Sequence, residues 1–111
     1  MIGETEQVGM TMPSNEQLLA FTKVYELGSY SVAAKEANKA RTTIRELVML
    51  LEDELNLSLF EVVGRSVKPT SEADRLYLHA KVLQDYAYRF KTIATSMLGK
   101  QEQSISIYYD A

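Results

Sequence analysis

The sequence predicts a mainly α-helical protein with one small domain, a single β-hairpin and a long helix towards its C-terminus. Two observations predict this fold. Apolar residues recur every three or four positions in three segments, and a short alanine-rich segment lies between the first two. Before the longest segment, two short β-capable runs flank Gly64. A chain of 111 residues has room for one such domain and an extension.

Composition excludes several classes of protein. The chain has no cysteine, so it holds no disulfide or thiolate metal site, and its only histidine, His79, leaves little scope for zinc or catalytic-triad chemistry. No apolar run approaches the roughly 18 residues of a membrane span, and residues 1–13 lack the basic start and apolar core of a signal peptide. We expect a cytoplasmic protein with no metal, no cofactor and no membrane partner, and a disordered leader over residues 1–13.

The first helix is expected to begin after Ser14. Ser14 and Gln17 have the spacing of a capping box, in which each side chain bonds the backbone N–H of the other residue. Apolar residues at helical spacing follow: Leu18, Phe21, Val24 and Tyr25. Gly28 is placed to end the helix, because glycine adopts the left-handed conformation at little cost.

A short second helix and a tight turn are expected next. Ser29 or Ser31 is placed to cap a helix that continues to about Ala37. The small alanines of this segment allow another helix to approach closely. Asn38, which tolerates a positive φ, suits the turn that follows.

The third helix begins in an unusually basic stretch. Residues 39–45 hold three basic residues and two threonines, although the whole chain carries a net charge of −3. The helix is expected to begin near Arg41 and to continue to Leu55. A later start is the alternative, because Thr43 and Glu46 also have capping-box spacing, and it would leave Arg41 in the turn.

The hairpin and the last helix complete the pattern. Residues 57–61 and 67–70 are expected to pair around a turn at residues 62–66, and Pro69, which lacks a backbone donor, to end the second strand. Thr70 or Ser71 is placed to cap the last helix, and Gly99 to end it.

The last helix carries an apolar seam. Its residues follow the heptad spacing of a coiled coil: Leu76, Ala80, Leu83, Ala87, Phe90, Ala94 and Met97. A seam of about three heptads is longer than a small domain needs to cover its own core. We therefore expect this seam to pair with a second copy of the chain in a homodimer.

The order helix, short helix, turn, helix, hairpin is that of a winged helix-turn-helix, here followed by a long dimerisation linker helix. In such a fold the third helix enters the major groove of double-stranded DNA, where long side chains reach base edges and hydroxyls meet phosphate. This function accounts for a basic, hydroxyl-rich helix start on an acidic chain. The residues expected to contact DNA are Ser29, Ser31, Arg41, Thr42, Thr43, Arg45, Arg65 and Lys68.

Residues 18–83 resemble the DNA-binding domain of LysR-type transcriptional regulators. The resemblance rests on LLAFTKVYELGSYSVAAKEA, on VMLLEDELNLSLFE, on GRSVKPT and on the His79-Ala80 pair. It implies a linker helix that pairs two subunits on an inverted-repeat operator, and an effector-binding domain after it. A small-molecule effector would bind only in that absent domain. The expected organisation is a leader at 1–13, a winged helix-turn-helix at 14–70, a linker helix at 71–99 and the start of a truncated regulatory domain at 100–111.

The chain departs from the family pattern where base specificity is expected. Residues 40–42 replace a usual Ser-Gln-Pro, and residues 45–47 replace a usual Ser-Arg-Gln. Arg41 is then a candidate bidentate reader of guanine, and Arg45 is a second candidate. Glu46 would repel phosphate unless it caps the helix or accepts a hydrogen bond from a cytosine amine.

One alternative function stays open. A helical dimer whose helix-turn-helix no longer binds DNA could serve as a protein-interaction module, and Glu46, the acidic chain and Val62, at a wing position where the family often has arginine, favour it. An enzyme is not expected, because the acids at 52–54 lie on one helix and cannot all face one site, and no glycine-rich phosphate loop is present. No catalytic residue is predicted.

Overall fold

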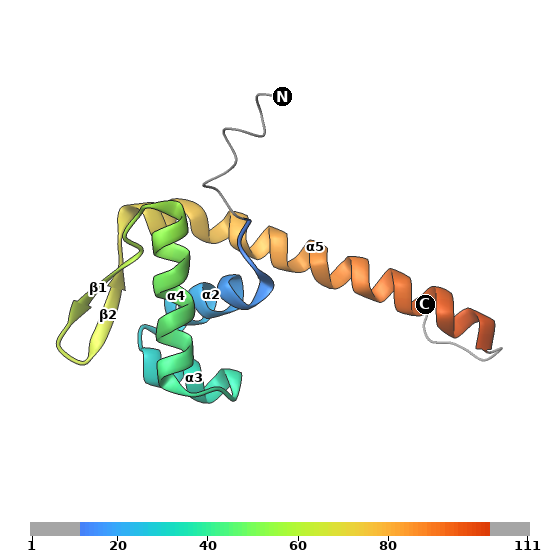
Figure 1. The fold of residues 1–111 in the computed structure, drawn as a ribbon, viewed down its shortest axis with the longest axis horizontal. Helices are drawn as coiled ribbons and strands as arrows, with labels where there is room; N and C mark the ends of the chain where they lie inside the picture. The colour runs from blue at the N-terminus through green and yellow to red at the C-terminus, as the bar shows by residue number, and fades with distance from the viewer. Residues whose placement is uncertain (1–11, 103–111) are drawn as a thin grey trace, which may run out of the picture. The chain divides into compact units, whose positions relative to one another are not determined.

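The computed structural model describes residues 12–102, and their side chains up to Leu98. In chain order it contains the elements α2 (Asn15–Leu27), α3 (Tyr30–Ala37), α4 (Arg41–Leu55), β1 (Phe60–Val63), β2 (Ser66–Pro69) and α5 (Ser71–Glu102) (Figure 1). The predicted fold, three helices with a β-hairpin wing and a long helix after it, is confirmed. The chain divides between Lys81 and Val82 into two compact units.

Two predicted segments fall largely outside the described residues. The leader was expected at residues 1–13, of which 1–11 are not described, and the start of a further domain at 100–111, of which 103–111 are not described. Residues 100–102 belong to α5. None of the helices within residues 12–102 is both long and apolar enough to cross a membrane.

α2 begins and ends as the sequence predicts. The Gln17 N–H donates to Ser14 Oγ at 3.0 Å, and the Ser14 N–H donates to Gln17 Oε1 at 2.9 Å, which completes the capping box. Gly28 ends the helix in the left-handed region with φ 70°, and its N–H donates to the Val24 carbonyl at 2.8 Å. The Gly28 carbonyl accepts from the Val67 N–H at 3.1 Å, so the end of α2 is tied to β2.

α3 is capped by Ser29 and not by the alternative, Ser31. The Val32 N–H donates to Ser29 Oγ at 3.1 Å, whereas Ser31 lies exposed in the first turn. Asn38 ends α3 with φ 58°, which confirms it as the left-handed turn residue.

α4 begins at Arg41, so the alternative start at Thr43 is wrong. Ala40 takes the N-cap position with extended backbone, and no side chain caps the helix. Backbone hydrogen bonds of the preceding turn define the start of the helix instead. The Lys39 N–H donates to the Ala34 carbonyl at 2.9 Å, and the Ala40 carbonyl then accepts from the N–H groups of Thr43 and Ile44, both at 3.1 Å.

The strands of the hairpin reach closer to the turn than the sequence predicts. β1 and β2 pair antiparallel as far as Val63 opposite Ser66, so that only Gly64 and Arg65 remain in the turn. The predicted turn at residues 62–66 is too long, because the two valines are β-branched and favour the strand. Gly64 takes a positive φ of 62° at the first turn position, where two-residue hairpin turns favour glycine. Pro69 ends β2, as predicted.

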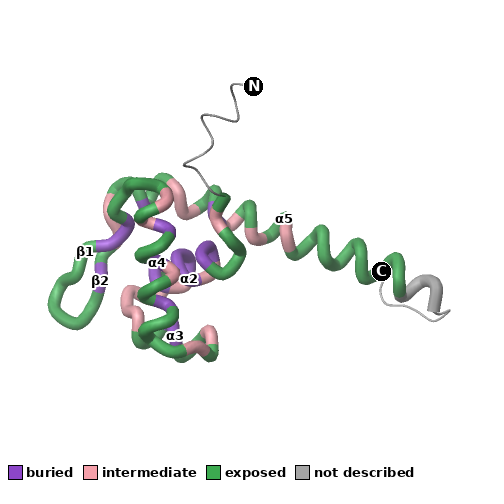
Figure 2. The backbone as a smooth tube through the Cα atoms, in the orientation of Figure 1, coloured by how far each residue is buried: buried purple, intermediate pink, exposed green. Residues whose placement is uncertain are grey.

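One core joins the three short helices, the hairpin and the first turns of α5. α2, α3 and α4 pack against one another, and β2 packs against α2. Figure 2 shows the buried positions on these elements. The buried apolar residues are Leu18, Ala20, Phe21, Val24, Ala33, Ala34, Ile44, Val48, Leu51, Leu59, Phe60, Val67, Ala73 and Ala80.

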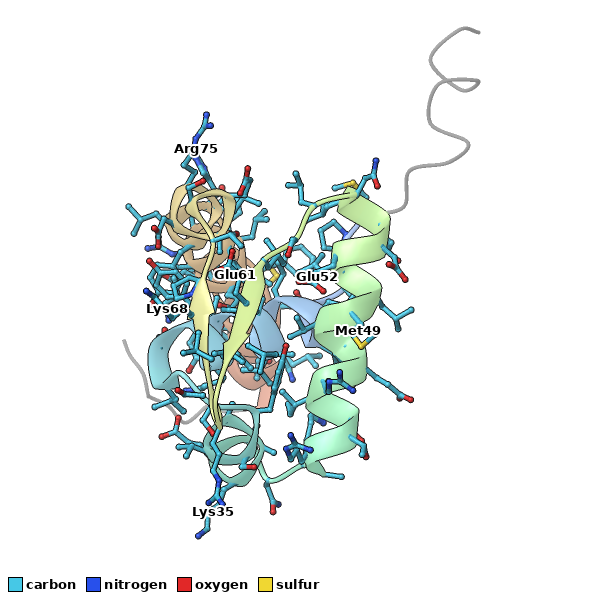
Figure 3. The ribbon with its side chains drawn as sticks, turned by 90° about the vertical axis from the view of Figure 1, so that its left-hand side faces the viewer. Lys35, Met49, Glu52, Glu61, Lys68 and Arg75 are labelled. Carbon is cyan, nitrogen blue, oxygen red and sulfur yellow. The ribbon has the colours of Figure 1, made fainter. Side chains whose placement is uncertain are left out.

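A carboxylate connects α4 to the hairpin. Glu52 Oε2 accepts from the Leu59 N–H at 2.7 Å and from the Phe60 N–H at 3.4 Å. Figure 3 shows Glu52 between α4 and the strands. Next along the chain, Thr70 Oγ1 donates to the Ser58 carbonyl at 2.7 Å and accepts from the Ala73 N–H at 3.2 Å. Thr70, and not Ser71, therefore caps α5.

Two tyrosines hold the first turns of α5 to α2. The rings of Tyr25 and Tyr77 stack with their centroids 4.1 Å apart. The Tyr25 hydroxyl donates to Asp74 Oδ1 at 2.8 Å, and the Tyr77 hydroxyl donates to the Glu26 carboxylate. Lys81 Nζ lies 3.6 Å from the same carboxylate. Each tyrosine thus bonds a carboxylate on the opposite helix.

α5 differs from its prediction at both ends of the seam. It passes Gly99 and ends at Glu102, so the predicted end is wrong; a helical glycine costs about 1 kcal/mol relative to alanine, and the Lys-Gln-Glu that follows favours helix. Leu76 and Ala80 belong to the protein's own core. The seam residues that remain outside this core are Leu83, Ala87, Phe90, Ala94 and Met97.

The stacked pair Tyr25 and Tyr77, with its hydrogen bonds to Asp74 and Glu26, forms what we call the tyrosine joint. This joint predicts a stability that depends on pH. The hydrogen bond to Glu26, with smaller contributions from burial and neighbouring charge, raises the pKa of Tyr77 to about 12, from a usual value of about 10. Folding therefore favours the protonated phenol. Its contribution is complete below pH about 10 and is lost as the pH rises towards 12.

Tyr77→Phe keeps the ring stack but removes the hydroxyl. At pH values below about 10, we expect this variant to unfold at a lower urea concentration than the wild type. The difference from the wild type should shrink as the pH rises towards 12, as followed by circular dichroism. Tyr86→Phe, at an exposed tyrosine of the same helix, is the control and should change little. A wild-type advantage that stays constant up to that pH would contradict this account of the joint.

Candidate nucleic-acid interface

α4 has one buried and one exposed face. Ile44 and Val48 are completely buried. A helix turns by about 100° per residue, so Glu46, two positions from each of them, lies about 160° around the helix from both. The exposed positions of α4 before its last turn are Arg41, Thr42, Thr43, Arg45, Glu46, Met49, Leu50 and Asp53. Thr42, Glu46, Met49 and Asp53 form the centre of this face, and we call them the central stripe.

The two arginines lie on the flank of this face that is turned towards α3. Tyr30, at the start of α3, is half-buried, and burial is the main cause that raises the pKa of its phenol, with a further contribution from Glu52. The positive charges of Arg45 and Arg41 lower the pKa of Tyr30 and so partly offset this increase. Both guanidinium groups therefore lie within electrostatic reach of the Tyr30 hydroxyl.

The predicted hydroxyl residues divide between structural and exposed positions. Ser29 Oγ accepts the capping hydrogen bond of α3, so its hydroxyl hydrogen is left to donate to a phosphate. Ser31 is exposed beside it, at a helix end whose N–H groups favour anions. Thr42 and Thr43 are both exposed in the first turn of α4, and neither of them caps the helix.

The hairpin supplies the remaining predicted residues. Arg65 is exposed in the turn, and Lys68 is exposed on β2, paired in register with Glu61 on β1 (Figure 3). Val62 is 71% exposed. In Figures 1 and 3 the hairpin turn and the N-terminal end of α4 are directed towards the same end of the domain, where α3 also lies. The structure thus brings Arg65, the first turn of α4 and α3 towards one end, whereas Lys68 lies further from the turn along β2 (Figure 3).

Among the described side chains, the arginines of this surface form no salt bridge. The ion pairs found among the described side chains are Lys23–Glu36, with Nζ 3.0 Å from Oε1, and Lys81–Glu26. Neither of them includes Arg41, Arg45 or Arg65. These guanidinium groups are therefore available to an anionic ligand. In the same part of the chain, no three histidine, aspartate or glutamate side chains gather as a metal site.

Sequence reasoning missed two residues of this surface. Tyr30 follows the capping serine of α3, and nothing in its spacing indicates that it lies within electrostatic reach of Arg41 and Arg45. Met49 belongs to the central stripe and is 45% exposed; its position follows from that of Ile44 and Val48, so helical spacing could have found it.

The chain matches a described family and several characterised regulators. Residues 15–74 match the sequence model of "Bacterial regulatory helix-turn-helix protein, lysR family". The chain is 45% identical over 64 residues to the HTH-type transcriptional regulator AceR of Acinetobacter baumannii, a match that covers 58% of this chain and 22% of AceR. It is 29% identical over 94 residues to the RuBisCO operon transcriptional regulator of Allochromatium vinosum, covering 85% of this chain and 31% of that protein. The chain thus spans about a fifth to a third of the length of these relatives.

Solved structures share the fold. The DNA-binding domain of BenM in complex with benA site 1 DNA is 26% identical, with a TM-score of 0.69 over 76% of this chain and 98% of that chain. The oxidized form of Corynebacterium glutamicum OxyR is also 26% identical, with a TM-score of 0.76 over 80% of this chain and 27% of OxyR. Since the family model covers more than half of the residues and the winged helix-turn-helix agrees with it, the chain belongs to the lysR family of bacterial regulatory helix-turn-helix proteins.

Proposed function

We propose that the chain binds double-stranded DNA sequence-specifically as a homodimer, and that it is the DNA-binding part of a bacterial transcription regulator that acts in the cytoplasm and is not an enzyme. The observation that carries the proposal is the start of α4. Arg41 and Arg45 are exposed there without an acidic partner among the described residues, on a fold that BenM uses in its DNA complex.

In the proposed complex α4 lies in the major groove. Its first turns present Arg41, Arg45 and the two threonines to base edges and phosphate, in keeping with the contact of recognition helices through their N-terminal residues. Ser29 and Ser31 donate to the phosphate backbone. Arg65 and Lys68 of the hairpin add contacts to phosphate or to the minor groove.

Dimerisation is proposed through the outer part of α5. Phe90 and Met97 are 75% and 62% exposed, and Leu83 is 51% exposed, at heptad spacing along one face. Such a face in water favours a partner of the same pattern, and two copies related by a twofold axis would place two α4 helices on an inverted-repeat operator. An effector would bind a regulatory domain outside residues 12–102.

A protein-interaction module is the competing function, favoured by the exposed Val62 of the wing and by Glu46 on α4. DNA binding separates the two functions. We expect the chain to bind genomic DNA fragments with an affinity that falls with salt, at a log–log slope of about −0.9 for each phosphate neutralised. Fluorescence anisotropy over a salt series measures the slope. A verified dimer without detectable binding, or with salt-independent binding, would leave the interaction module as the better account.

Arg41→Ala tests the proposed base contact. Loss of a bidentate contact to guanine should weaken binding by about 1–3 kcal/mol and relax the preference at one operator position. The control is Arg75→Ala, which removes the same charge at the opposite end of the domain from the hairpin turn (Figure 3). Dissociation constants for a set of single-position operator variants provide the measurement. An equal loss on all sequences would make Arg41 a phosphate contact.

Ala87→Glu tests the dimer. A charge in the centre of the seam should give monomers in analytical ultracentrifugation, and binding to the full operator should lose an avidity factor on the order of 10² or more. Thr92→Glu is the matched control, since Thr92 lies two positions from both Phe90 and Ala94 and hence about 160° around the helix from each. If the Ala87→Glu protein sediments as a dimer, the interface lies elsewhere.

A further inference from the structure

We infer that Glu46 is a specificity-determining residue, whose carboxylate accepts a hydrogen bond from the exocyclic amine of a cytosine in the major groove. The inference rests on the proposed function, because it assigns one base contact within the proposed DNA complex. It makes an acidic residue on the recognition helix a reader of sequence, whereas its charge alone would count against DNA binding.

The first argument is position. Glu46 lies in the central stripe, opposite the buried Ile44 and Val48. Met49, about one turn further along the stripe, is 45% exposed. A helix placed in the groove with this face inward directs its central stripe at the bases and its flanks at the groove walls, where the phosphates lie. Glu46 is thus placed for bases and not for phosphate.

The second argument is that Glu46 has no role within the described fold. It does not cap α4, because the helix begins five residues earlier, at Arg41. The positions three and four residues away hold Thr42, Thr43, Met49 and Leu50, so no basic residue stands at the spacing of a helical ion pair. Among side chains 12–98, no hydrogen bond or ion pair of the Glu46 carboxylate is found.

The third argument is chemical. A carboxylate offers only acceptors, and in the major groove cytosine presents only its N4 amine donor. Adenine presents its amine beside the N7 acceptor, and guanine presents two acceptors, so both place a lone pair against the Glu46 oxygens. Thymine presents an acceptor and a methyl group. The carboxylate therefore attracts cytosine and repels guanine, which is the combination that produces a specificity difference.

The experiment compares two variants that remove the same charge. Operators are first selected from a random DNA pool with the wild-type chain, and dissociation constants are then measured for all four bases at each position. Glu46→Gln is the test variant, and Glu72→Gln, at an exposed acid in the first turn of α5, is its matched control. Glu46→Gln should tighten binding generally, because it removes a negative charge from the surface that faces DNA, whereas Glu72→Gln should change the affinity little.

The expected results differ in base preference. The wild type and Glu72→Gln should prefer cytosine at one position of each half-site by about 5- to 150-fold, the range for one good contact. Glu46→Gln should move that preference to adenine, since a glutamine amide matches the amine and N7 of adenine. Glu46→Ala should lose the cytosine preference without gaining one for adenine. Circular dichroism spectra confirm that the variants fold.

The outcomes separate the two proposals. If the wild type binds selected operators and Glu46→Gln keeps the same base preference at every position, the role of Glu46 is overturned while the proposed function stands. Binding without any preference for cytosine overturns it equally. If the dimeric wild type binds no DNA at any salt concentration, the proposed function itself fails, and the contact assigned to Glu46 fails with it.

Discussion

The Glu52 carboxylate joins α4 to the β1–β2 hairpin, and the proposed binding surface depends on the geometry that this connection helps to fix. Its Oε2 accepts from the backbone N–H groups of Leu59 and Phe60, two residues whose side chains belong to the buried core. Hydrogen bonds to an ionised acceptor are about twice as strong as neutral ones, and a buried amide without a partner is costly. α4 and β1 therefore keep one geometry. With the core stripe of α4 anchored and the hairpin tied to it, the opposite face of the helix and the hairpin turn are left to meet a ligand.

An acidic chain presents a basic surface because many of its carboxylates serve the fold. Glu26 and Asp74 accept from the tyrosine hydroxyls of the α2–α5 joint, Glu36 pairs with Lys23, and Glu52 accepts from backbone amides. Each of these carboxylates is engaged by a partner within the domain. The net charge of −3 thus describes the chain as a whole, whereas a ligand meets a local surface whose charge is different.

The sequence was informative where residue chemistry is local. The capping box at Ser14 and the left-handed end at Gly28 depend on a few neighbouring residues, and both were predicted correctly. Heptad spacing, in contrast, marks an apolar face without saying what covers it, so Ala80 was assigned to a partner although it packs in the protein's own core. Gly99 has the residue type of a helix end but lies within α5, because a glycine can also be accommodated in a helix at a cost of about 1 kcal/mol. Tyr30 could not be placed at the site, because its proximity to α4 arises only from the packing of α3.

The crossed tyrosines have a mechanical consequence. Tyr25 on α2 bonds a carboxylate on α5, and Tyr77 on α5 bonds a carboxylate on α2, with their rings stacked between the two bonds. Rotation of the first turns of α5 about their axis, in either sense, stretches at least one bond, while separation of the helices opens the stack. A torque applied along these turns is therefore borne by α2, and through the shared core by α4. The joint therefore couples the orientation of α4 to that of the first turns of α5.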